Sequence, residues 1–254
     1  MINSIEENPL TNIISDGGYT AIFRTIGIIG DSLSSGEHES LNEDGKVGYH
    51  DYYEYSWGQF MARACGLTAY NFSVGGLTAK EFQRLARYMK CFTPEKACQG
   101  YIIALGVNDL KDVNFHYSGG FGTMPDFENK DDTLIGAYVQ VIRQIRDLQP
   151  KARIFVVTPP VRHYEDGERI KREERFSEFL RSLPQYFEFL YVIDLICLRV
   201  VQAFCQSKKQ GELVDYYPIF IVQHFFVEFI FKITFGSAIM PACNCCGHYL
   251  LFMS

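Results

Sequence analysis

The sequence predicts an α/β protein with a mostly parallel sheet. Five apolar segments rich in β-branched and aromatic residues lie along the chain, and most of them end in a polar or glycine-containing turn. Segments with helical periodicity separate several of these strands. This alternation is typical of parallel strands joined by crossover helices. In such sheets ligands bind beyond the carboxyl ends of the strands, so the turns after the strands are the place to look for chemistry.

The strands are expected where the apolar runs fall. These runs occupy residues 19–30, 67–76, 100–109, 152–160 and 189–195. A polar loop is expected at residues 34–50, which are rich in Glu, Asn and Gly. A second loop, which contains Gly and Asp and has no clear period, is expected at residues 111–131. Residues 16–18, "DGG", are expected to form a turn within a polar N-terminal arm, residues 1–20.

The helices are expected where apolar residues recur at helical spacing. Residues 55–66 place Trp57, Phe60, Met61 and Ala64 on one face, with Gly66 as a C-cap. Residues 78–92 begin at Thr78 as an N-cap. Residues 132–150 carry a strong apolar face and are stopped by a proline. The charged residues 165–183 suggest a solvent-facing helix.

Composition limits the possible classes of function. The 254 residues suffice for one large domain or two small ones, and 47% apolar with 21% charged residues is ordinary for a globular protein. A net charge of −6 argues against nucleic acid as a partner. Neither a signal peptide nor an apolar run of membrane-spanning length is evident, so we expect no membrane span and a cytoplasmic protein with reduced thiols at Cys65, Cys91 and Cys98.

Three strand ends carry residues suited to acyl transfer, which needs a nucleophile and donors for the developing oxyanion. Ser32 follows the first strand in "IGIIGDSLSSG", Gly76 follows the second, and Asn108 follows the third. The Ser32 and Gly76 N–H groups and the Asn108 amide could each donate to an oxyanion. Each of these residues alone is more often part of a turn or a helix cap. Phosphate-binding glycine fingerprints are absent.

Taken together, "IGDSLSSG", "NFSVGGLTAKEF" and "IALGVND" resemble the first three motif blocks of the SGNH (GDSL-type) hydrolases, over roughly residues 20–195. The resemblance implies a flavodoxin-like three-layer α/β/α sandwich and ester hydrolysis through a serine acyl-enzyme, with no cofactor. It also implies that Ser32 is the nucleophile and that Gly76 and Asn108 are oxyanion donors. Asp31 and Asp109 are expected to support the turns, and residues 158–160 to line the cleft.

The family's late "DxxH" block, which supplies the general base, is not recognisable. His224 and His248 are the candidates for the base nearest the expected position, and His163 precedes it. His38, His50 and His116 fall in expected loops. For each histidine taken singly, a solvated or structural role is the simpler interpretation.

Residues 196–254 differ from the rest of the chain. Only 7 of these 59 residues are charged, against 47 of the 195 before them, while eight phenylalanines and five cysteines gather here. Two interpretations stay open: a buried C-terminal helix with a divergent end, or a segment out of register with the family's reading frame. The run "CNCCGH" invites a zinc site, but its spacing suits four ligands poorly, so we expect no metal.

The expected organisation is therefore an arm (1–20), an SGNH hydrolase-like domain (21–195) and a divergent C-terminal segment of the same domain (196–254). The leading hypothesis is a serine esterase acting on a small-molecule, carbohydrate or lipid acyl ester. One alternative is a related ligand-binding protein that lacks a positioned histidine. Another is a nucleotide-binding flavodoxin-like protein, although Asp31 would place a carboxylate where the phosphate should lie. The oligomeric state is left open.

Overall fold

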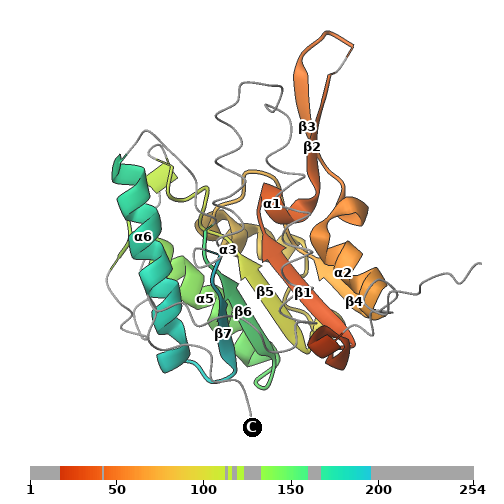
Figure 1. The fold of residues 1–254 in the computed structure, drawn as a ribbon, viewed down its shortest axis with the longest axis vertical. Helices are drawn as coiled ribbons and strands as arrows, with labels where there is room; N and C mark the ends of the chain where they lie inside the picture. The colour runs from red at the N-terminus through yellow and green to blue at the C-terminus, as the bar shows by residue number, and fades with distance from the viewer. Residues whose placement is uncertain are drawn as a thin grey trace, which may run out of the picture.

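A five-stranded parallel sheet organises the molecule (Figure 1). The computed structural model describes residues 18–41, 43–111, 114–115, 119–122, 133–159 and 167–195. The strands of the sheet are β1 (Thr25–Gly30), β4 (Thr68–Asn71), β5 (Gly100–Ala104), β6 (Arg153–Val157) and β7 (Leu190–Ile193). They lie in the order β4-β1-β5-β6-β7, and every neighbouring pair is parallel. Strand β1 is flanked by β4 on one side and by β5 on the other, which is a flavodoxin-like strand order. The direction in which successive strands are added reverses between β1 and β5, and this is the topological switch point of the sheet.

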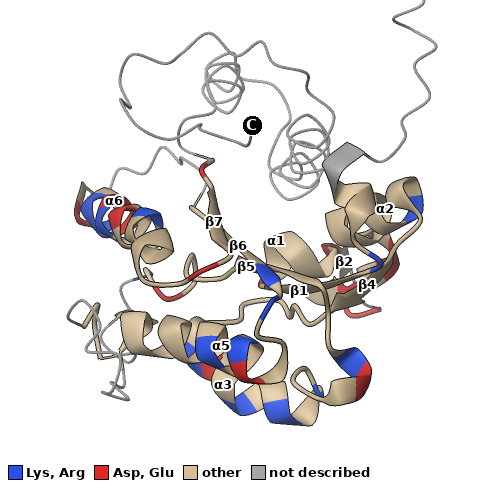
Figure 2. Cartoon of the chain, turned by 90° about the horizontal axis from the view of Figure 1, so that it is seen from below, with Lys and Arg blue, Asp and Glu red and all other residues tan. Residues whose placement is uncertain are grey.

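Helices lie on both faces of the sheet (Figure 2). The longer ones are α2 (Trp57–Cys65), α3 (Ala79–Tyr88), α5 (Leu134–Leu148) and α6 (Gly167–Ser182). Apolar residues of α3, α5 and α6 share one core, whereas those of α2 belong to a second core with β1. The predicted α/β class with a mostly parallel, three-layer arrangement is confirmed. Shorter elements are η1 (Gly18–Ile22), α1 (Ser32–Ser35), η2 (Tyr53–Tyr55), η3 (Pro94–Lys96) and η4 (Leu183–Gln185).

The helix boundaries follow from capping residues, as the sequence predicts. Thr78 and Glu81 form a reciprocal capping box at the start of α3. Gly66 ends α2 in the left-handed conformation, at φ 66°, where a residue with a Cβ would be strained. The predicted apolar face of α5 is buried: Leu134, Ala137, Tyr138, Val141, Ile142 and Ile145.

The largest error in the predicted elements is the polar loop at residues 34–50. Its first residues, Ser34 and Ser35, are buried in α1, and the rest forms an antiparallel ribbon of β2 (Glu37–Leu41) and β3 (Val47–Asp51). The ribbon has no buried apolar face, and its composition, rich in Glu, Asn and Gly, is typical of a loop. The signal that was available is Gly45 in "EDGK", which adopts φ 71° in the connecting turn.

Three smaller predictions about elements were also wrong. The 19–30 run begins as the 3₁₀ turn η1, and only residues 25–30 form a strand. Phe60 and Ala64 are exposed, because the buried face of α2 centres on Trp57, Met61 and Ala62. Helix α6 faces solvent only in part, since Phe176, Phe179 and Leu180 pack into the core shared with α5.

The three cysteines in the described part of the chain are free thiols, as predicted. Cys91 and Cys98 are fully buried, and Cys65 is half-buried. Burial raises the pKa of the Cys91 and Cys98 thiols to about 12, so they are neutral packing groups at physiological pH. The five late cysteines and most of the N-terminal arm lie outside the described residues.

Candidate active site

The turn after β1 presents Ser32 at the first position of a single helical turn. Asp31 caps that turn, its carboxylate accepting a hydrogen bond from the Leu33 N–H at 3.0 Å. Gly36 closes it at φ 78°, and a Cβ there would overlap the Tyr52 carbonyl. Ser32 is half-buried, whereas Ser34 and Ser35 are fully buried. Of the three serines, Ser32 is therefore the one with an accessible side chain.

The turn after β4 places Gly76 in a conformation that favours glycine. The Leu77 N–H donates to the Val74 carbonyl at 3.2 Å, and Gly76 has φ 73°, as at the third position of a type II turn. The Val74 N–H donates to the Gly30 carbonyl at 3.3 Å, which joins this turn to the end of β1. Gly76 is exposed, and a Cβ on it would meet open space. Its backbone conformation, rather than crowding, is what requires glycine.

The Asn108 amide links these two turns. Its Nδ2 donates to Asp31 Oδ2 and to the Leu77 carbonyl, both at 3.2 Å, and the side chain is buried. Asp31 adjoins Ser32 and Leu77 adjoins Gly76, so the structure brings the three residues singled out in the sequence to one place. It also shows that both amide hydrogens of Asn108 have protein acceptors.

Asp109 holds the start of α3, close to the turn that contains Gly76. Its carboxylate accepts the Ala79 N–H at 3.0 Å at the start of α3, and the side chain is fully buried. Burial raises the pKa of Asp109 to about 7, outweighing the backbone hydrogen bonds that lower it. The structural roles expected for Asp31 and Asp109 are both observed.

The raised pKa of Asp109 predicts a pH-dependent stability. Since the ordinary value is 3.8, the folded protein binds more protons than the unfolded chain between about pH 4 and 7. The contribution of Asp109 to the free energy of unfolding therefore decreases as the pH rises from about 4 to 7. Asp109→Asn keeps an acceptor for the Ala79 N–H and removes the titration. Urea unfolding at pH 5 and pH 8 should show a smaller loss of stability in the variant; equal losses would contradict the prediction.

The end of β6 lies close to α1, the helical turn that carries Ser32. Thr158 Oγ donates to Asp194 at 3.2 Å and accepts the Leu195 N–H at 2.8 Å, which ties β6 to the turn after β7. Thr158 and Pro159 line a small, mainly apolar pocket together with Leu33 and Ser34 of α1. Pro160 lies outside the described residues.

Two histidines fall within the described ranges, both on the β2–β3 ribbon. His38 Nδ1 lies 3.2 Å from the His50 carbonyl oxygen, and the His38 ring packs edge-on against Tyr52 with centroids 4.4 Å apart. Both side chains are exposed. The candidate bases His224 and His248 lie outside the described residues, as do His116 and His163.

Sequence reasoning missed two contributions to the site. Asn71, at the end of β4, donates to the Ser34 carbonyl at 2.8 Å and so fixes α1. Asp51, at the end of β3, accepts the Gly75 N–H. The polar Asn71 after an apolar strand was a usable signal, whereas nothing local connects Asp51 with a glycine 24 residues later.

Within the described ranges no three side chains of histidine, cysteine, aspartate or glutamate form a metal-binding group. The same ranges contain no helix long and apolar enough to cross a bilayer.

Comparison with solved structures supports the fold. A family two carbohydrate esterase from Clostridium thermocellum, solved with cellohexaose, has a TM-score of 0.54 at 16% identity, covering 83% of this chain and 63% of that one. A family 2 carbohydrate esterase with a carbohydrate binding domain from Corynascus thermopiles has a TM-score of 0.55 at 17% identity, covering 83% and 65%. A possible lipase from Chitinophaga pinensis has a TM-score of 0.50 at 20% identity, covering 78% and 80%.

The chain thus spans less than two thirds of the length of the two carbohydrate esterases. A search of curated proteins found no match. The sequence profile of the GDSL-like lipase/acylhydrolase family matches residues 28–217, which include all three motif blocks. The chain belongs to the GDSL-like lipase/acylhydrolase family.

Proposed function

We propose that the protein hydrolyses acyl esters with Ser32 as nucleophile. The observation that carries the proposal is the Asn108 amide, which joins the residue beside Ser32 to the residue beside Gly76. A nucleophile and two oxyanion donors drawn from three strand ends then face one reacting carbonyl. These residues follow strands at the switch point between β1 and β5, and ligands bind at this point in sheets of this order.

In the proposed reaction, Ser32 Oγ forms a bond to the ester carbonyl carbon while a general base takes its proton. The oxyanion accepts hydrogen bonds from the N–H groups of Ser32 and Gly76, for which the described residues supply no other acceptor. The C–O bond to the alcohol then breaks, and the alcohol leaves with the proton. Water attacks the acyl-enzyme by the same steps and releases the acid.

We assign the Asn108 side-chain amide as the third hydrogen-bond donor to the oxyanion. In the structure its amide donates to Asp31 and Leu77, which fixes the orientation of the side chain. A fixed amide costs no reorganisation when negative charge develops beside it. An oxyanion would compete with the neutral Leu77 carbonyl for one of the two hydrogens, and a charged acceptor makes the stronger hydrogen bond.

The base is proposed to be a histidine outside the described residues, with His224 and His248 as candidates. Replacing each histidine with glutamine identifies the base: substitution of the essential histidine abolishes turnover, and substitution of the other leaves turnover unchanged.

The substrate class proposed is an acylated carbohydrate, supported by the carbohydrate esterases among the structures of similar fold.

Covalent labelling tests the mechanism directly. A fluorophosphonate requires an activated serine, so the full chain should gain one adduct, mapped to Ser32 by peptide mass spectrometry. As the fraction of labelled protein rises, the rate of p-nitrophenyl acetate hydrolysis should fall in proportion. Absence of an adduct together with tight binding of an ester ligand would favour the non-catalytic alternative instead.

A further inference from the structure

The β2–β3 ribbon brings two carboxylates to the candidate oxyanion turn. Figure 1 shows the ribbon projecting from the end of the sheet where β1 stops. Glu37 begins β2 and Asp51 ends β3, and the two residues are direct cross-strand partners at the base of the ribbon. Directly opposite residues of an antiparallel pair point to the same face, so both carboxylates lie on one side of the ribbon.

Both carboxylates contact Gly75, the residue before the proposed oxyanion donor. The Gly75 N–H donates to Asp51 Oδ1 at 3.1 Å and to Oδ2 at 3.2 Å. Glu37 lies against the Gly75 α-carbon so closely that a Cβ would overlap Glu37 Oε2. A side chain at residue 75 would displace the Glu37 carboxylate, whereas residue 76 favours glycine because of its φ angle.

The turn needs such an anchor because it contains two consecutive glycines. A Gly-Gly pair has wide conformational freedom, so the Gly76 N–H could point in several directions. The hydrogen bond from Leu77 to Val74 closes the turn, but it does not engage the Gly75 N–H. Asp51 supplies that missing restraint from an element 24 residues away.

We propose that Asp51 is a positioning residue that holds the Gly75–Gly76 turn so that the Gly76 N–H is aimed at the oxyanion. This inference rests on the proposed esterase function and extends it to a residue of the ribbon. Asp51 itself does not touch the reacting atoms. Its effect is to place the donor before the reaction begins, which is where most of the benefit of an oxyanion hole arises.

Glu37 is the secondary member of the pair. Burial raises its pKa, and the charges of Asp51, Asp31 and Glu39 raise it further, while Lys111 lowers it. The Glu37 carboxyl lies beside the Gly75 α-carbon, whereas the Gly75 N–H donates to Asp51. We therefore expect Glu37→Gln to change kcat by less than about threefold, because it keeps the shape and loses only the charge.

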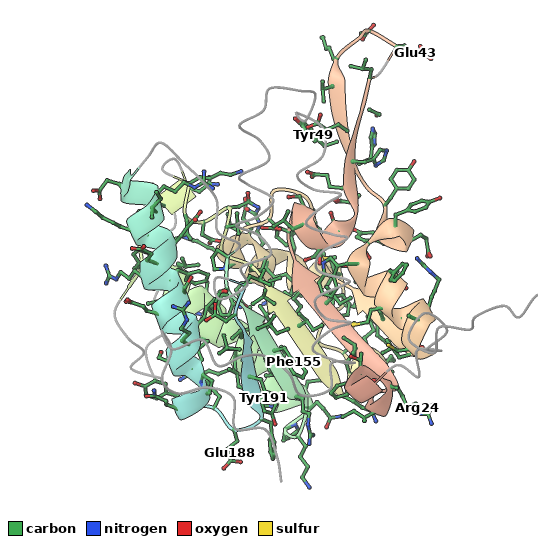
Figure 3. The ribbon with its side chains drawn as sticks, in the orientation of Figure 1. Arg24, Glu43, Tyr49, Phe155, Glu188 and Tyr191 are labelled. Carbon is green, nitrogen blue, oxygen red and sulfur yellow. The ribbon has the colours of Figure 1, made fainter. Side chains whose placement is uncertain are left out.

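Substitution of Asp51 separates positioning from simple stability. Asp51→Ala should lower kcat for p-nitrophenyl acetate by about 10–100-fold, with KM changed less than about twofold, because donor misplacement affects the transition state more than substrate binding. Asp51→Asn keeps an oxygen acceptor for the Gly75 N–H and should recover most of the lost kcat. Glu43→Ala, at the exposed tip of the same ribbon (Figure 3), is the matched control and should leave kcat unchanged.

The outcomes distinguish this inference from the proposed function. If the parent protein neither labels at Ser32 nor turns over ester, the esterase function has failed. If the parent is active and Asp51→Ala matches it, or raises KM with kcat unchanged, the positioning role is overturned. Equal impairment of the Asn and Ala variants at equal melting temperature would overturn it as well. Should Asp51→Ala unfold, Asp51→Ser replaces it in the same comparison.

Discussion

Replacing Ser32 with alanine should lower the turnover of p-nitrophenyl acetate by about 10³-fold or more, since the proposed acyl-enzyme can no longer form. The fold should persist. Ser32 is half-buried at the first position of α1, its N–H is unchanged by the substitution, and alanine suits a helical position. Initial rates and thermal unfolding of the same preparation measure the two effects separately.

Ser34→Ala provides the matched control in the same helical turn. The Ser34 hydroxyl is fully buried and forms no hydrogen bond within the described part of the chain, so its removal leaves no group unpaired. We expect unchanged turnover and equal or slightly higher stability. If Ser34→Ala lost as much activity as Ser32→Ala, the assignment of the nucleophile would have to be abandoned.

Asn108→Ala should lower kcat by about 10²–10³-fold, the usual effect of losing one oxyanion donor. It should also cost about 1–3 kcal/mol of unfolding free energy, because the buried Asp31 carboxylate and Leu77 carbonyl each lose a donor. KM should change little, because the third hydrogen bond is proposed to form only with the tetrahedral intermediate. Steady-state kinetics well below the melting temperature of the variant separate the two losses.

Asn114→Ala is the corresponding control. The Asn114 amide donates to the Asn108 backbone carbonyl at 2.9 Å and so supports the same segment. It should reduce kcat by less than about threefold. A loss as large as that of Asn108→Ala would mean that rigidity of the segment, rather than the Asn108 amide itself, sets the rate.

Much of the fold could be predicted because apolar periodicity and capping chemistry are local. The run before Gly30, the Thr78 cap and the buried face of α5 are all visible within a dozen residues. Their convergence was also predictable, since parallel strands end at one edge of a sheet. Three candidate site residues could thus be selected from the sequence and are found close together.

What could not be predicted depends on contacts between distant residues. The β2–β3 ribbon is largely exposed and buries no apolar face, and the hydrogen bond from the Gly75 N–H to Asp51 is visible only in three dimensions. That Asn108 donates to both Asp31 and Leu77 likewise depends on atomic distances that no motif encodes. The identity of the general base stays a prediction.

The bridge from Asn108 to Asp31 also has a consequence for folding. Its two ends lie 77 residues apart, after β5 and β1, so it forms only when these two strands are paired. Loop closure over such a distance is among the slow events in the folding of parallel sheets. The proposed catalytic centre is thus assembled by the late, long-range steps of folding, and a chain that has only collapsed and formed its helices would not yet possess it.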